Sequence, residues 1–134
     1  MRSPPFSWQG HEYGTNLQHA LLLARRLLAA DASTNRSIIL VTDGEPTAHI
    51  EDGRVDFNYP PTRRTIEETL REVGRCTRDR ITINTFMLDR SRALGAFVDG
   101  VTRMNHGRAF YTDPDRLGEF VLVDYLDRRT RRVA

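Results

Sequence analysis

The sequence contains no lysine, a single cysteine and no long apolar run. Its 20 basic residues are all arginine and stand against 18 acidic residues, so the formal net charge is only +2. This near balance argues against a nucleic-acid partner, and the basic residues cluster only in the tail at 128–134. No run approaches the ~20 apolar residues of a membrane-spanning helix, and the N-terminus lacks a stretch of signal-peptide length. We therefore expect a cytoplasmic protein with no membrane partner.

The motifs of the common catalytic sites are also missing. The sequence has no G-x-S-x-G, no P-loop and no glycine-rich dinucleotide fingerprint. Its four histidines lack the spacing of a recognisable zinc site. The lone Cys76 has no partner for an internal disulfide and no identifiable histidine partner, so it is expected to be a half-buried packing residue and not a nucleophile. These absences predict that the chain is not an enzyme.

What is present is an alternation of helical and extended patterns, in a length that suits one domain. The apolar spacing predicts helices over Asn16–Asp31, from Thr65 to near Arg80, around Leu94–Val101 and after Asp113-Pro114, with strands at 37–42, 81–88 and 108–112. Such alternation is typical of an α/β fold with a parallel sheet of about three strands and helices on both faces. Right-handed crossovers would place these strands side by side in sequence order. The strand at 37–42 is so apolar that we expect both its faces to be covered.

Local signals refine this outline. Thr15 or Asn16 is the expected cap of the first helix, and Leu22, Leu23 and Leu27 widen the apolar face of that helix. A small hairpin is predicted around Asp52-Gly53, where Ile50 and Val55 flank the turn. Thr65 and Glu68 have the spacing of a capping box at the start of the second helix.

Oxygen-bearing side chains follow the first predicted strand directly, in the segment VTDGEPTAH at 41–49. Ligands of open parallel sheets bind at the carboxyl ends of the strands, and Asp43 lies at that end. Thr15 would reach the same edge if the first helix packs beside this strand. A hydroxyl and a carboxylate are hard oxygen ligands, which Mg²⁺ or Mn²⁺ prefers.

The segments YGTNLQHAL and SIILVTDGEPT, separated by one helix, resemble the von Willebrand factor type A (vWA) domain. The resemblance covers about residues 13–126, which divides the chain into an extension at 1–12, a truncated vWA-like domain at 13–127 and the basic tail. It implies a three-layer, Rossmann-like fold and a metal-ion-dependent adhesion site, in which Thr15 matches the threonine and Asp43 matches the later aspartate of the family. The sequence is most similar to bacterial intracellular members that work beside MoxR-type AAA+ ATPases, such as the carbon monoxide dehydrogenase accessory and magnesium chelatase groups.

One part of the family pattern has no counterpart here. The DxSxS motif of the first family strand is absent, and with it two serine hydroxyls and one aspartate of the metal site. Thr15 and Asp43 alone leave most of an octahedral shell to water, so we expect binding of Mg²⁺ or Mn²⁺ to be weak or absent. The loops around them are expected to contact a partner, through Gly14, Asn16, Gly44, Glu45, Thr47 and His49.

The missing strand has a structural consequence. In the family it pairs with the strand that 37–42 resembles, so here this apolar strand would have an open edge. Pairing with the same strand of a second copy across a two-fold axis would give a homodimer with a continuous six-stranded sheet. The alternative is that the chain is a piece of a longer product.

The function predicted from these features is a non-enzymatic protein-interaction module with a remnant metal site. The resemblance further implies an AAA+ ATPase as partner and a role in assembling or metallating an enzyme. Two alternatives stay open. One is a hydrolase that uses a metal at Asp43 and Glu45, and the other is a structural remnant or fragment with no independent function.

Overall fold

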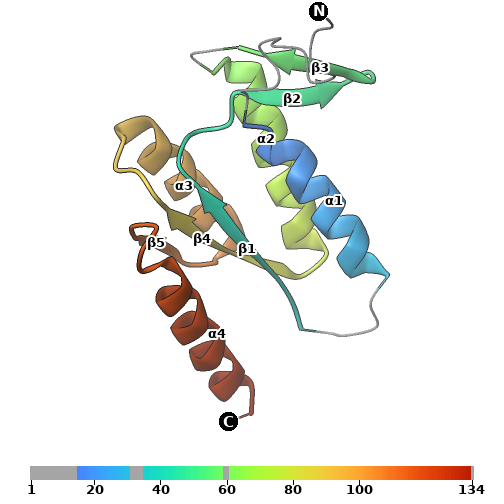
Figure 1. The fold of residues 1–134 in the computed structure, drawn as a ribbon. Helices are drawn as coiled ribbons and strands as arrows, with labels where there is room; N and C mark the ends of the chain where they lie inside the picture. Colours follow the sequence, from blue (N-terminus) through green and yellow to red (C-terminus); the bar gives the residue numbers. More distant parts are fainter. Residues whose placement is uncertain (1–14, 31–34, 59–60, 134) are drawn as a thin grey trace, which may run out of the picture.

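The computed structural model describes residues 15–30, 35–58 and 61–133 (Figure 1). Helices and strands alternate along the chain in the order α1 (Leu17–Ala29), β1 (Arg36–Thr42), β2 (Ala48–Glu51), β3 (Arg54–Phe57), α2 (Arg63–Arg78), β4 (Ile81–Met87), α3 (Arg92–Asn105), β5 (Ala109–Tyr111) and α4 (Leu117–Val133). No helix in these ranges combines the length and apolar character needed to cross a membrane.

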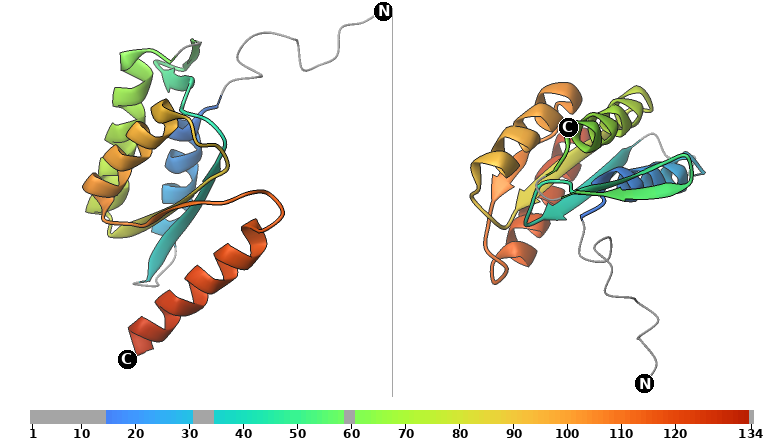
Figure 2. Two further views of the ribbon diagram at one scale, coloured as in Figure 1. Left: turned by 90° about the vertical axis from the view of Figure 1, so that its left-hand side faces the viewer. Right: turned by 90° about the horizontal axis from the view of Figure 1, so that it is seen from above.

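The main sheet is parallel and has the strand order β1-β4-β5. This order confirms the predicted arrangement of the strands side by side in sequence order. The helices α1, α2 and α3 lie on one face of the sheet, and α4 lies on the opposite side (Figure 2). The α/β fold with helices on both faces is therefore confirmed.

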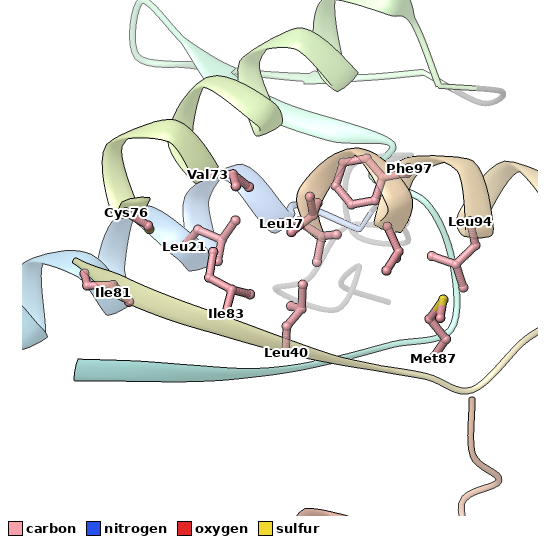
Figure 3. Close-up of a cluster of buried hydrophobic side chains, with 12 residues drawn as sticks. Leu17, Leu21, Leu40, Val73, Cys76, Ile81, Ile83, Met87, Leu94 and Phe97 are labelled. Carbon is pink, nitrogen blue, oxygen red and sulfur yellow. The ribbon is translucent and has the colours of Figure 1, made fainter. Parts of the chain in front are cut away.

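The hydrophobic core lies between the sheet and the first three helices (Figure 3). The central strand β4 contributes Ile81, Ile83 and Met87, all buried. The other buried members come from α1, β1, α2 and α3: Leu17, Leu21, Leu40, Val73, Cys76, Leu94, Phe97, Val98 and Val101. Burying a side chain of this size stabilises the fold by about 1.5–3 kcal/mol, so this cluster is the main apolar contribution to stability.

Cys76 packs against its neighbours as predicted, but it is fully buried in this core and not half-buried. Desolvation by burial raises the pKa of its thiol to about 11, so the thiol is protonated near neutral pH. A protonated, buried thiol is a small apolar group and a poor nucleophile.

The apolar strand β1 is not covered on both faces, so that prediction was wrong. Leu40 faces the core, but the alternate side chains Ile39 and Val41 are each 41% exposed. Side chains alternate along a strand, so these two lie on the face of the sheet opposite α1, α2 and α3. The helix α4 is on that side, but it does not bury them. On α1 the widened apolar face was also wrong in part, because Leu23 is exposed and Leu27 is 77% exposed.

The cap of α1 was predicted correctly, and the cap of α2 was not. Asn16 caps α1, because its Oδ1 accepts a hydrogen bond of 2.9 Å from the backbone N–H of His19. The cap of α2 is Thr62, three residues before the predicted Thr65, and its Oγ1 accepts from the backbone N–H of Thr65. Glu68 makes no capping box and instead lies 2.7 Å from Arg71.

The predicted hairpin is confirmed as the pair β2–β3. Asp52 (φ 53°) and Gly53 (φ 76°) both have positive φ, which is the geometry of a two-residue type I′ turn. Ile50 and Val55 lie opposite each other across the two strands. The short turn therefore fixes the register of every cross-strand pair in the hairpin.

The end of α3 is joined to the start of β4 by the buried Asn105. Its Oδ1 accepts from the backbone N–H of Ile83 at 2.6 Å, and its Nδ2 donates to the carbonyl of Ile81 at 2.8 Å and to Thr77 Oγ1 at 3.0 Å. Two residues later the chain passes so close to β4 that a Cβ on Gly107 would overlap the Ile83 carbonyl. This contact fixes the path of the chain into β5.

We predict that Asn105→Ala lowers the free energy of unfolding by about 3 kcal/mol, because it leaves a buried N–H and a buried C=O without partners. Urea unfolding followed by circular dichroism measures the change. Arg103→Ala, on the exposed side of the same helix, is the control and should change stability by less than about 0.5 kcal/mol. Equal effects in the two variants would contradict the role assigned to Asn105.

Candidate functional site

A cavity of about 340 Å³ lies at the carboxyl edge of the sheet, where β1 and β4 end. We call it the carboxyl-edge cavity. Its lining includes five of the predicted residues: Thr15, Asp43, Gly44, Glu45 and Thr47. Four further residues complete it: Phe57, Asp89, Ser91 and Ala93. The structure therefore brings together the loop before α1, the loop after β1 and the loop after β4.

The loop before α1 is held to the loop after β1 by a pair of threonines. The backbone N–H of Thr15 donates to Thr47 Oγ1 at 2.8 Å, and the backbone N–H of Thr47 donates to the carbonyl of Thr15 at 2.9 Å. The N–H of Ala48 donates to the same carbonyl at 3.2 Å. These reciprocal bonds fix Thr15 at the cavity although it lies 32 residues from Thr47.

The first turn after β1 leaves Asp43 exposed. Thr42 Oγ1 donates to the carbonyl of Gly44 at 2.7 Å and accepts from its N–H at 3.3 Å, so the turn is closed by Thr42. Asp43 itself is exposed to solvent. Its carboxylate has no hydrogen-bond donor or basic partner among residues 15–30, 35–58 and 61–133. It is therefore available to a cation or to a partner.

Asp89 and Ser91 belong to the cavity but were missed in the sequence. Asp89 comes two residues after β4 and is exposed, while Ser91 Oγ accepts from the N–H of Leu94 and caps α3. The rule that drew attention to Asp43 applies equally to Asp89, because both follow parallel neighbouring strands. A second hydrogen bond, from the N–H of Leu88 to the carbonyl of Thr42 at 2.9 Å, ties the two strand ends together.

The lining of the carboxyl-edge cavity is acidic. It carries the carboxylates of Asp43, Glu45 and Asp89, and no arginine lines it within 15–30, 35–58 and 61–133. The hydroxyls of Thr15, Thr47 and Ser91 add neutral oxygen atoms. Such a hard, oxygen-only donor set fits Mg²⁺ or Mn²⁺ that keeps several of its waters, and fits thiophilic metals poorly.

A neighbouring cavity of about 470 Å³ continues this edge toward β5. Asp89 lines both cavities, and the second also carries Arg90 and Arg116. The guanidinium of Arg90 lies 4.8 Å from the centre of the Tyr111 ring, a cation–π contact that holds it at the rim. An acidic hollow and a partly basic one therefore lie side by side.

Three of the predicted partner-binding residues lie elsewhere or outside the described chain. Gly14 falls outside the described residues. The Asn16 side chain is used as the cap of α1, and it does not line the cavity. His49 is buried at 1% exposure, and its Nδ1 lies 2.9 Å from Thr65 Oγ1 of α2.

Comparison with known proteins gives one family and a small group of relatives. The family model described as "Rv0959-like protein, vWA domain" matches residues 6–126. "Uncharacterized protein Rv0959" and "Uncharacterized protein MT0986" from two strains of Mycobacterium tuberculosis, and "Uncharacterized protein Mb0984" from Mycobacterium bovis, are each 43% identical to this chain over 90% of its length. The match covers 19% of each relative, so the chain spans about a fifth of their length. No solved structure matches the chain.

We predict that Thr47→Val loosens the loop before α1, because the N–H of Thr15 loses its acceptor. The free energy of unfolding should fall by about 1–2 kcal/mol, and amide hydrogen exchange at Thr15 should become faster. Thr102→Val is the matched control, since the Thr102 hydroxyl bonds only within α3, at the exposed carbonyl of Asp99. Unchanged exchange at Thr15 in the Thr47 variant would contradict the bonding described above.

Proposed function

Since the chain belongs to the Rv0959-like vWA domain family, we propose that it is a non-enzymatic protein-interaction module. Its contact surface is formed by the loops at the carboxyl edge of the sheet, around Thr15, Asp43 and Glu45. Domains of this class often mediate protein interactions, and the family assignment covers most of the chain.

The single observation that supports this proposal most is the open, acidic carboxyl-edge cavity. Its carboxylates are exposed or half-buried and stand on loops that hydrogen bonds hold together. Among the residues that the structure describes, its lining contains no histidine or cysteine, and the serine in it is used as a helix cap. A nucleophile paired with a general base is therefore not found in the lining, whereas oxygen groups for a cation and a partner are.

Thr15 and Asp43 would hold the cation, with Glu45 and Asp89 adding negative charge nearby. A bound Mg²⁺ or Mn²⁺ would supply a Lewis-acidic position for an acidic side chain of the partner. Because the protein offers few ligands and the rest are waters, binding of the ion alone is weak. The partner that best suits this site carries an exposed carboxylate. We propose that this partner is a MoxR-type AAA+ ATPase, which the chain would assist in the assembly or metallation of an enzyme.

The open edge of β1 is the second element of the proposed interaction surface. In the described sheet β1 pairs only with β4, and its alternate side chains Ile39 and Val41 are half exposed. An unpaired edge of this kind favours pairing with another strand. We propose that β1 of a second copy fills this place in an antiparallel, isologous pair.

Titration of Mg²⁺ and Mn²⁺ into the purified chain tests the cation site. We expect weak, saturable chemical-shift changes at residues 15 and 43–45, and a loss of affinity of about tenfold or more in Asp43→Ala, because a charged ligand is removed. Asp99→Ala, an exposed carboxylate on α3, is the control and should leave binding unchanged. Shifts that persist unaltered in Asp43→Ala would overturn the proposed site.

Light scattering during size-exclusion chromatography tests the β1 pair. We expect a dimer at micromolar concentration, and a dissociation constant raised by at least about tenfold in Ile39→Arg, since a charge would be placed beside the paired strands. Val55→Arg adds the same charge at an exposed apolar position of the hairpin and should leave the dimer intact. A wild-type chain that stays monomeric and soluble at these concentrations would refute the pair.

A further inference from the structure

A second group of ligand-type side chains lies on the β2–β3 hairpin, away from the carboxyl-edge cavity. His49 and Glu51 are two residues apart on β2, so their side chains lie on the same face of the strand. Asp56 is the cross-strand partner of His49 on β3. We call these three residues the hairpin cluster, and the two-residue Asp52-Gly53 turn fixes their register.

His49 has a buried ring nitrogen without a hydrogen-bond partner. The side chain is 1% exposed, and Nε2 makes no hydrogen bond within the described part of the chain. Nε2 points at the carboxylates: it lies 3.6 Å from Glu51 Oε1 and 3.6 Å from Asp56 Oδ2. These distances are too long for hydrogen bonds, and a buried polar atom left unpaired costs free energy.

The same distances suit two ligands of one metal ion. Ligand atoms that each lie ~2.1 Å from a tetrahedral zinc are roughly 3.4 Å apart. One ligand atom from each of the three residues lies within 4.8 Å of the others. The three atoms can therefore converge on a common centre after small rotations of the carboxylates.

The opposite side of the His49 ring is also arranged as in metal sites. Nδ1 lies 2.9 Å from Thr65 Oγ1, which in turn lies 3.1 Å from Thr62 Oγ1. If Nδ1–H donates to Thr65, the lone pair is on Nε2, toward the carboxylates. A hydrogen bond on the far ring nitrogen is the usual device that fixes the tautomer of a metal-binding histidine.

We propose that the hairpin cluster is a binding site for a late first-row divalent cation of the zinc type, held by His49 Nε2 and the carboxylates of Glu51 and Asp56. Water completes the shell on the open side, because Asp56 is exposed and Glu51 is half-buried. One imidazole and two carboxylates favour such an ion over Mg²⁺, which prefers oxygen ligands alone. The two sites of the chain would thus select different metals.

Arg64 contacts the hairpin cluster through Glu51 and leaves room for a bound ion. Its Nε donates to Glu51 Oε1 at 2.7 Å, and this hydrogen bond lowers the pKa of Glu51 and keeps the carboxylate ionised. Glu68 lies 3.6 Å from Arg64 Nη2 and offsets part of the guanidinium charge. Glu51 Oε1, the oxygen that lies 3.6 Å from His49 Nε2, has a second lone pair that can bind the ion, while Arg64 orients the carboxylate as outer partners of metal ligands do.

Occupancy of the hairpin cluster would fasten the hairpin to α2 through His49 and Thr65. The same strand follows directly on Thr47, which holds the loop of Thr15 at the carboxyl-edge cavity. A cation in the hairpin would therefore stiffen one wall of that cavity. The proposal does not depend on the cavity binding a metal or a partner.

The test is calorimetric titration of zinc into the full chain after treatment with a chelator, with nitrogen NMR of the imidazole rings. We expect one equivalent of Zn²⁺ to bind and to shift the His49 Nε2 resonance more than that of any other ring nitrogen. Asp56→Asn and Glu51→Gln should each weaken binding by about tenfold or more. Asp52→Asn, at the tip of the same hairpin, should bind as the wild type does.

Asp56 is exposed, so Asp56→Asn should fold normally and keeps the test decisive even if variants of the buried His49 do not fold. Asp43→Ala should leave zinc binding unchanged, which separates the hairpin cluster from the carboxyl-edge cavity. No zinc binding by the wild type, or equal affinity in the wild type and in the Asp56 and Glu51 variants, would overturn the proposal. A zinc-induced shift at another histidine with none at His49 would do the same.

Discussion

The parallel pairing of β1 with β4 is the constraint on which the rest of the molecule depends. It runs in one register from the pair Arg36–Ile81 to the pair Thr42–Met87. Because the strands are parallel and end together, the residues that follow them, Asp43 and Asp89, reach the same edge. The carboxyl-edge cavity is thus a product of sheet topology, and side chains far apart in the sequence meet there without any local motif that joins them.

The order of helices and strands could be predicted because it depends on local patterns. The Asp52-Gly53 turn and the Asn16 cap were also predictable, since each is decided within a few residues. Burial was not predictable to the same degree. Ile39 and Val41 look like core residues in the sequence, and their exposure depends on which element covers the far face of the sheet. The prediction of the α2 cap failed for another reason. Thr62 and Thr65 are the same residue type and can both cap a helix, so only the path of the chain decides between them.

For the candidate site, the rule of strand ends and the vWA resemblance led to Thr15 and Asp43, but Asp89 was missed because the rule was applied to one strand only. The hairpin cluster was missed because a search for histidine and cysteine spacing along the chain finds ligands on one helix or loop. His49 and Asp56 are brought together across two strands. A two-residue turn at Asp52-Gly53 already implies that pair, so applying the predicted register to each cross-strand position would have found it.

The helix α4 reverses the usual distribution of polar and apolar contacts. Its buried carboxylate, Asp124, accepts from Asn84 Nδ2 at 2.8 Å and lies 3.5 Å from Arg108, whereas its exposed apolar side chains are Leu122, Val123, Tyr125 and Leu126. The contacts of Asp124 with Asn84 and Arg108 are directional, so they fix the position of the helix more than they stabilise it. Its apolar side chains lie on the same side of the sheet as Ile39 and Val41. Exposed apolar groups on a helix and on a strand at the same side of a sheet are typical of an interface, and Ile39 and Val41 belong to the strand β1 that we propose as a site of pairing.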